Sequence, residues 1–172
     1  MASSLKVIET ERLVLRWLSI ADAAFIFELV NEPSWLKYIG DKGVKTLQDA
    51  EDYIRKGPIE MYERLGFGLY LVEIKKSGEQ IGICGLIKRE ALEDVDLGFA
   101  FLPKFWGKCY AFESASAATS YGRNVLGLPR IAAITSQDNR PSEKLLEKLG
   151  FRFERKVRLS TSDDDLKLHV TT

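Results

Sequence analysis

Asp96 is the residue whose type and surroundings best suit proton transfer in this sequence. It lies in the stretch VDLGFAF at residues 95–101, where large apolar side chains alternate with Asp96, Gly98 and Ala100. This alternation is typical of a strand. A strand face made of one carboxylate and two very small residues cannot fill a core, so we expect it to leave room for a ligand.

The segment after this strand has the features of an anion-binding turn. Pro103 interrupts the strand, and the sequence KFWGKCYA at residues 104–111 leads into a helical segment rich in Ala and Ser. Where a strand, a tight turn and a helix N-terminus follow one another, unpaired backbone N–H groups and the helix dipole point at the turn. Gly107 would let the backbone approach an anion closely.

A further helical segment begins at Asn139. Asn suits the N-cap position, Pro141 suits the first turn, and Gly150 supplies a left-handed stop. The Asn139 side chain could serve as a cap or bind a ligand. The two roles are compatible, because the amide offers donors as well as an acceptor.

Three segments of the chain carry a resemblance to a known family. They are TERLVLR at residues 10–16, WGKCYAFE at residues 106–113 and NRPSEKLLEKLGF at residues 139–151. Together they resemble the GNAT N-acetyltransferase superfamily, in the branch that includes the ribosomal-protein N-terminal acetyltransferases. The family's acetyl-CoA loop has the pattern Gln/Arg-x-x-Gly-x-Gly/Ala. Here Lys104 occupies its first position and Cys109 its last, so two of the three anchor positions depart from the pattern.

The resemblance implies a GNAT-like α/β (α+β) fold and transfer of an acetyl group from acetyl-CoA to a primary amine. The acceptor would be a protein or peptide N-terminus or a small-molecule amine. One alternative is a CoA-binding sensor or assembly module without turnover, and another is an interaction domain, which would leave the Asp-Gly-Ala face unexplained. The implied cofactor-binding residues are Phe99, Ala100, Phe101, Lys104, Trp106, Gly107, Lys108, Cys109, Tyr110, Ala111, Asn139 and Ser142.

Amide formation needs an unprotonated amine, so a base must accept a proton. Asp96 is the predicted general base, because most other carboxylates lie in charged turns or on solvated helix faces; the alternative is a structural ion pair with a Lys or Arg. Many relatives carry Glu at this position, and the shorter Asp suggests a water relay. Many relatives also use a Tyr to support the leaving thiolate. That position is Leu146 here, so we assign the role to Ser142.

Cys109 carries a separate expectation. Because a Cβ is easily accommodated where the backbone is helical, we expect Cys109 inside the first turn of the helix that follows, with its thiol in no essential contact.

The order of elements predicts a mixed, mainly antiparallel central sheet flanked by helices. The glycines at 82 and 85 indicate close backbone approach in a central strand. Four aromatic residues in the N-terminal helical region could wall the acceptor site or simply pack in the core: Trp35, Tyr38, Tyr53 and Tyr62. The expected strands are 8–16, 67–74, 80–88, 95–101, 130–135, 152–157 and 164–170, and the expected helices are 19–30, 47–56 with a break at Gly57-Pro58, 108–123 and 139–149.

Composition agrees with a single acetyltransferase domain over residues 1–172, with 45% hydrophobic residues. The 25 basic and 25 acidic residues cancel, which gives no electrostatic footprint for nucleic acid or an anionic membrane. One His and two separated Cys make no convincing metal site, and both thiols should be reduced. We expect a cytoplasmic monomer or homodimer without metal, nucleic-acid or membrane partners.

Overall fold

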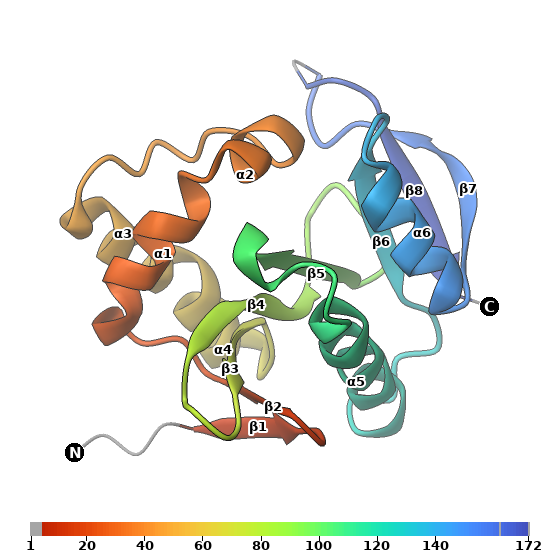
Figure 1. The fold of residues 1–172 in the computed structure, drawn as a ribbon. Helices are drawn as coiled ribbons and strands as arrows, with labels where there is room; N and C mark the ends of the chain where they lie inside the picture. The colour runs from red at the N-terminus through yellow and green to blue at the C-terminus, as the bar shows by residue number, and fades with distance from the viewer. Residues whose placement is uncertain (1–4, 162, 172) are drawn as a thin grey trace.

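An eight-stranded sheet organises the chain in the computed structural model, which describes residues 5–161 and 163–171 (Figure 1). The strand order is β1-β2-β3-β4-β5-β6-β8-β7, and only the β5–β6 pair is parallel among the described residues. This confirms the predicted mixed, mainly antiparallel sheet. The strands are β1 (Lys6–Glu9), β2 (Leu13–Arg16), β3 (Leu69–Ile74), β4 (Gln80–Ile87), β5 (Asp96–Phe101), β6 (Ala132–Ser136), β7 (Phe151–Val157) and β8 (Leu166–Thr171).

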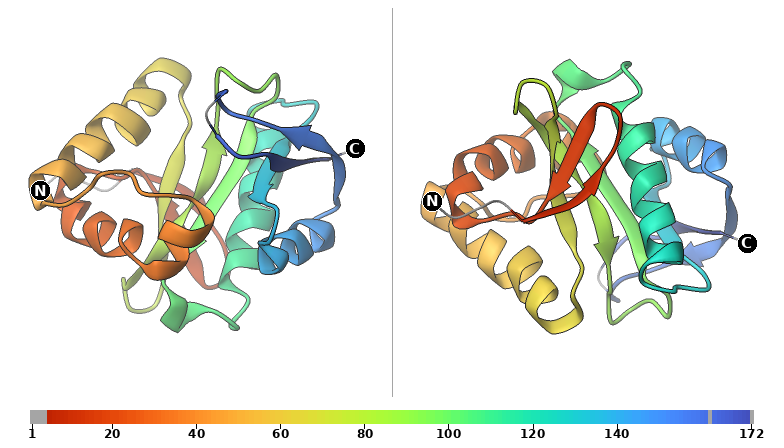
Figure 2. Two further views of the ribbon diagram at one scale, coloured as in Figure 1. Left: turned by 90° about the horizontal axis from the view of Figure 1, so that it is seen from above. Right: turned by 90° about the horizontal axis from the view of Figure 1, so that it is seen from below.

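Helices cover both faces of this sheet. Figure 2 shows the N-terminal helices on one side of the central strands and α5 on the other. The helical elements are η1 (Ile20–Asp22), α1 (Ala23–Val30), α2 (Pro33–Tyr38), α3 (Leu47–Ile54), η2 (Arg55–Ile59), α4 (Glu60–Leu65), η3 (Pro103–Phe105), α5 (Tyr110–Asn124) and α6 (Arg140–Lys148).

Small residues allow α5 to lie close against the sheet. A Cβ on Gly122 would come within 2.9 Å of side-chain atoms of Ile131 and Leu86. The hydroxyls of Ser114 and Thr119 are buried in this contact, and each donates a hydrogen bond to a carbonyl one turn earlier in α5. The helix therefore buries its polar groups in a satisfied state.

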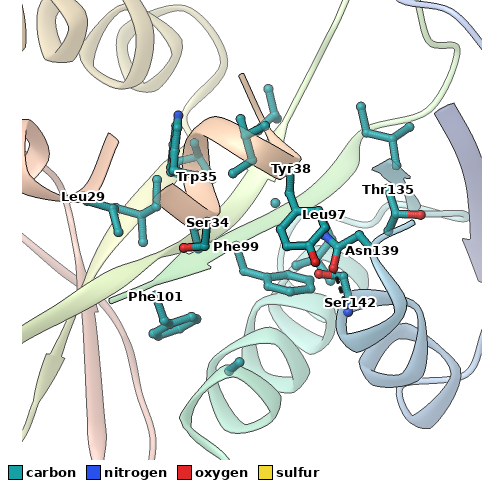
Figure 3. A pocket seen from close by; sticks show the side chains of 18 of the residues that line it. Leu29, Ser34, Trp35, Tyr38, Leu97, Phe99, Phe101, Thr135, Asn139 and Ser142 are labelled. Carbon is teal, nitrogen blue, oxygen red and sulfur yellow. Dashed lines mark hydrogen bonds between the residues drawn. The ribbon is translucent and has the colours of Figure 1, made fainter. Parts of the chain in front are cut away.

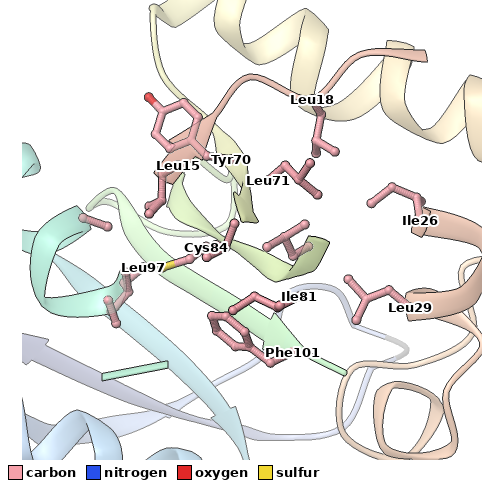
Figure 4. Packing of buried hydrophobic residues seen from close by; sticks show 14 of the residues in the cluster. Leu15, Leu18, Ile26, Leu29, Tyr70, Leu71, Ile81, Cys84, Leu97 and Phe101 are labelled. Carbon is pink, nitrogen blue, oxygen red and sulfur yellow. The ribbon is translucent and has the colours of Figure 1, made fainter. Parts of the chain in front are cut away.

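The main hydrophobic core lies between the central strands and the helices (Figure 4). Its fully buried side chains include Leu15, Leu71 and Ile83. Gly85 of β4 is required here, because a Cβ would lie 2.1 Å from the carbonyl oxygen of Gly68. The prediction of close backbone approach in this strand is therefore confirmed at Gly85.

Two predicted elements are wrong in detail. Residues 8–16 form the hairpin of β1 and β2, because the Thr10 hydroxyl accepts a hydrogen bond from the Leu13 N–H and stabilises a turn between them. The predicted break at Gly57-Pro58 is instead a π-helical segment, η2, that joins α3 to α4. A widened turn accommodates a proline that cannot donate a backbone hydrogen bond.

The sheet opens between β5 and β6. β4 pairs with β5 from Asp96 to Phe101, but β5 and β6 share only the Asp96–Ala132 register pair. Beyond this pair the two parallel strands diverge, and the opening places unpaired backbone beside the turn at residues 103–109.

Candidate active site

A cavity of about 1160 Å³ lies at the opening between β5 and β6 (Figure 3). β5, β6, α2, α3, the start of α5 and the start of α6 all contribute to its wall. A pocket for one drug-sized ligand measures about 300–1,000 Å³. The cavity is therefore large enough for two reactants that meet along β5.

Both faces of β5 contribute to this cavity. The sequence predicted a ligand on the face of Asp96, Gly98 and Ala100, and these three residues do line it. Leu97, Phe99 and Phe101 on the opposite face also line it, as the close view shows (Figure 3). Leu97 and Phe101 belong to the hydrophobic core as well as to the cavity wall, because β5 loses its neighbour on one edge and becomes accessible from both sides.

Strand register identifies the Phe99 N–H as a free donor. The Leu102 N–H donates a hydrogen bond to the Ile81 carbonyl oxygen, so the even-numbered residues of β5 direct their backbone N–H groups at β4. Because the direction alternates along a strand, the N–H of Phe99 points to the β6 side. Pairing with β6 has already ended there.

The turn before α5 presents a row of unpaired amides. The backbone N–H groups from Gly107 to Phe112 have no hydrogen-bond acceptor within residues 5–161 and 163–171. Gly107 has a left-handed φ of 77°, and an added Cβ would meet no atom within 4 Å. Consecutive free amides at a helix N-terminus are suited to bind an anion, and the anion site predicted for this segment stays a prediction.

Most of the predicted cofactor residues lie along this cavity. The lining includes Phe99, Ala100, Phe101, Trp106, Gly107, Cys109, Tyr110, Ala111, Asn139 and Ser142. Lys104 and Lys108 are not part of the lining, and the Lys104 side chain is exposed beside Glu79. Trp106 donates from its indole N–H to the Phe101 carbonyl oxygen at 2.9 Å while its ring stays 55% exposed. The bond holds an aromatic surface at the cavity mouth.

Cys109 is not inside the first helical turn, so the expectation of helical dihedrals is wrong. It is the N-cap residue of α5 with φ 64° and ψ 16°, and among the described residues no other non-glycine residue has a positive φ. The turn needs a left-handed residue there, which explains why the family pattern allows Gly. For an L-residue this conformation costs about 1–2 kcal/mol.

We expect Cys109→Gly to raise the free energy of unfolding by about 0.5–1 kcal/mol, because relief of strain exceeds the added chain entropy of glycine. Cys109→Ala should leave the strain in place and change stability little. Both variants should keep coenzyme A affinity, measured by calorimetry beside thermal unfolding. A large loss of turnover in folded Cys109→Ala would instead assign a chemical role to the thiol.

The turn between β1 and β2 holds the start of α5, a role that sequence analysis missed. Glu113 accepts hydrogen bonds from the Thr10 hydroxyl at 2.5 Å, the Arg12 N–H at 3.0 Å and the Arg12 Nε at 2.7 Å. Arg12 also donates to the Lys108 carbonyl oxygen at 3.1 Å and stacks over the Tyr110 ring at 4.5 Å. The first two of the three resembling segments are thus in direct contact. Their joint match to one family pattern was the sequence signal that could have indicated this contact.

We expect Glu113→Gln to weaken coenzyme A binding about 3- to 10-fold and to lower the free energy of unfolding by about 1–3 kcal/mol, because charge-assisted bonds to Arg12 and Thr10 are lost. Calorimetry with coenzyme A and denaturant unfolding would measure the two effects. Glu60→Gln is the matched control, since Glu60 forms an exposed pair with Arg64 far from the turn. Equal behaviour of the two variants would show that the contact does not position the turn.

Asn139 and Ser142 meet at the start of α6. The Asn139 Oδ1 accepts a hydrogen bond from the Ser142 N–H at 3.3 Å, which confirms the cap. Both side chains line the cavity and face the part that Phe99 also lines (Figure 3). Leu146 is buried and lines the cavity too, with no polar atom to offer. The Ser142 hydroxyl is therefore at hand for the role that Leu146 cannot fill.

Asp96 is buried in the wall of the cavity, with 1% of its surface exposed. Burial raises its pKa to about 6, and Arg89, with its Nε 3.3 Å from the Asp96 Oδ1, opposes this rise. The predicted alternative, an ion pair, is therefore present. Oδ1 has no well-aligned hydrogen-bond donor among the described residues. A carboxylate with a pKa near 6 and a free oxygen can still accept a proton.

The N-terminal helices α2 and α3 wall one side of the cavity, which we call the helical arm. Trp35, Tyr38 and Tyr53 line it, whereas Tyr62 is a core residue that stacks on Trp17 and Tyr70. The buried Trp35 Nε1 has no partner among the described residues.

His169 lies outside the cavity lining. It is buried on β8 and shares a hydrogen bond of 3.1 Å with Thr135. It is therefore no rival to Asp96 as the base.

The fold defines the class of protein to which the chain belongs. It is similar to a GNAT-family acetyltransferase structure from Bacillus anthracis, with a TM-score of 0.78 and 26% identity over 95% of this chain and 96% of that one. It is also similar to RimL, a ribosomal-protein α-N-acetyltransferase solved in complex with coenzyme A, with a TM-score of 0.81 and 16% identity over 96% of each chain. The class is that of the acetyltransferases.

Sequence comparison identifies the family. Residues 12–152 match the acetyltransferase (GNAT) domain model. The chain is 30% identical to YoaA of Bacillus subtilis, an uncharacterized N-acetyltransferase, over 86% of this chain and 84% of that protein. The protein belongs to the GNAT acetyltransferase family, as the resemblance implied.

The described residues contain neither a membrane-spanning helix nor a metal-binding cluster. Within residues 5–161 and 163–171, no helix is long and apolar enough to cross a membrane. The same residues contain no group of three or more His, Cys, Asp and Glu side chains that could hold a metal ion.

Proposed function

We propose that the protein is an N-acetyltransferase that moves the acetyl group of acetyl-CoA to a primary amine. Acetyl-CoA is the general acyl donor of the family. The observation that carries the proposal is that Asp96, the turn of free amides and residues of α2 and α3 all line one cavity. A donor bound at the turn and an amine in the helical arm would meet beside a carboxylate of raised pKa.

The turn fits the donor's phosphates. Free amides from Gly107 to Phe112 and the N-terminus of α5 would bind the pyrophosphate, and the exposed Lys104 and Lys108 lie in the same turn region. The opening between β5 and β6 would hold the pantetheine arm, with Asn139 beside it. Phe99 would then direct its N–H at the thioester carbonyl oxygen.

The chemistry follows from these positions. Asp96, directly or through a water, removes a proton from the amine, whose nitrogen attacks the thioester carbon. The Phe99 N–H stabilises the developing oxyanion. The new C–N bond forms as the C–S bond breaks, and the thiolate leaves with a hydrogen bond from the Ser142 hydroxyl. The proton held by Asp96 passes to the thiolate, directly or through solvent, which restores the base. The products are an N-acetylated amine and coenzyme A.

Two measurements test this function. Calorimetry with coenzyme A separates a CoA-binding protein from an interaction domain, and thiol release from acetyl-CoA with a panel of amines separates an enzyme from a CoA sensor. Binding without thiol release for any amine, peptide N-termini included, would favour the sensor. Absence of both would refute the proposal. Residence in the cytoplasm and a monomeric or dimeric state stay predictions.

A further inference from the structure

Two cationic side chains that line the cavity, Arg89 and Lys42, have hydrogen-bond donors that the described residues leave unused. Arg89 reaches Asp96 only through Nε, at 3.3 and 3.4 Å from the two carboxylate oxygens. Among the described residues, neither terminal nitrogen of Arg89 forms a hydrogen bond. Lys42 also lines the cavity, and it makes no ion pair or hydrogen bond to any residue the structure describes. These donors remain available to a ligand.

Arg89 and Lys42 lie close enough to act on each other. Desolvation lowers the pKa of Lys42, and repulsion by Arg89 adds to this effect, while Asp163 opposes it. Tyr53 lies at the same corner, where the Arg89 charge partly offsets the rise of the tyrosine pKa caused by burial. Two cations that repel each other beside a cavity are stabilised when an anion binds between them.

Most carboxylates that line this part of the cavity do not pair with Arg89 or Lys42. Asp49 accepts backbone hydrogen bonds at the start of α3, and Asp52 pairs with Arg55. Glu32 precedes α2 and, like Asp49 and Asp52, is not among the charges that shift the Lys42 pKa. Asp96 pairs with Arg89 only through Nε, and Asp163, which acts on Lys42, forms no ion pair with it in the described part of the chain. The terminal nitrogens of Arg89 and the Lys42 ammonium are therefore the donors that an anionic group could bind.

We propose that the acceptor is a small zwitterion of the α-amino acid class, whose carboxylate binds Arg89 and Lys42 while its amine faces Asp96. This inference rests on the proposed acetyl transfer and names its substrate class. The guanidinium matches a carboxylate in shape and can bind it through both terminal nitrogens. Because Arg89 contacts Asp96 directly, a carboxylate bound to Arg89 would place an amine a few bonds away beside the base.

Matched acceptors test this inference. Thiol release from acetyl-CoA would be measured with free α-amino acids and with the carboxamides of the same amino acids, which keep the amine and lose the negative charge. A polyamine and a peptide with a free N-terminus complete the panel. We expect kcat/KM for the best amino acid to exceed that of its carboxamide at least 10-fold, after correction for the fraction of unprotonated amine.

A substitution at Lys42 tests whether the preference for a carboxylate depends on the Arg89 and Lys42 side chains. Lys42→Gln should lower the ratio of amino acid to carboxamide kcat/KM about 10-fold, while Lys45→Gln should not change the ratio. Lys45 is the matched control, since it belongs to the same segment, pairs with Asp41 and does not line the cavity. Lys42 is chosen over Arg89 because a change at Arg89 would also alter the Asp96 pKa.

The outcomes separate this inference from the proposed function. Turnover of carboxamides, polyamines or peptides at least as fast as of amino acids would overturn the zwitterion assignment and leave acetyl transfer standing. An unchanged ratio in Lys42→Gln would also overturn it. Coenzyme A binding without turnover of any amine would overturn the proposed function and this inference together.

Discussion

Replacing Gly107 with valine is expected to lower coenzyme A affinity at least 10-fold in a protein that still folds. Gly107 has φ 77°, and a β-branched residue is a strong outlier in this region. The turn would relax to another conformation, because the left-handed one costs an L-residue about 1–2 kcal/mol and more when it is branched. The amides from Gly107 onward would then no longer converge on one anion. Calorimetry with coenzyme A measures the loss.

Gly127→Val is the matched control for this experiment. Gly127 has φ 69°, and a Cβ there would also meet no atom within 4 Å, but it does not line the cavity. The two substitutions impose a similar backbone strain, so their effects on unfolding should be alike while only the change at Gly107 affects binding. Wild-type affinity in folded Gly107→Val would show that the turn is structural, and the assignment of the phosphate site would be wrong.

The turn before α5 was predictable from the sequence, because the residues that indicate it are neighbours in the chain. A strand that alternates, a proline, a glycine and a helical segment follow one another within 20 or so residues, and each acts on its neighbours in the chain. The same holds for Asn139, whose cap depends on residues three positions away. Local pattern therefore found the strand, the turn and the start of α6, but it placed the start of α5 two residues too early.

Contacts between distant segments were not predictable in the same way. The pair of Arg12 and Glu113 joins residues about a hundred positions apart, so no local pattern indicated it. The left-handed Cys109 could not be foreseen either, because residue type favours other conformations and the packed turn overrides that preference. The cationic corner at Arg89 and Lys42 likewise depends on how a loop meets the end of β4.

Asp96→Asn is expected to lower turnover about 10²–10⁴-fold while coenzyme A binding survives, because the amide keeps the shape of the side chain but cannot accept a proton. In the wild type, kcat/KM for the best amine should rise as the pH increases through about 6, where the carboxyl loses its proton. The variant should lack this rise and keep only the slower increase due to ionisation of the amine. Thiol-release rates from pH 5 to 9 would show both effects.

Stability provides an independent check that Asp96 has the raised pKa. Because the folded protein holds this proton more tightly than the unfolded chain, its contribution to stability is present below the ordinary value of 3.8 and decreases as the pH rises to about 6. Asp96→Asn should remove that decrease. Asp94→Asn is the control, since Asp94 pairs with Arg130 and does not line the cavity. If Asp96→Asn turns over like the wild type from pH 6 to 9, then another group is the base or the amine arrives already deprotonated, and Asp96 is only the partner of Arg89.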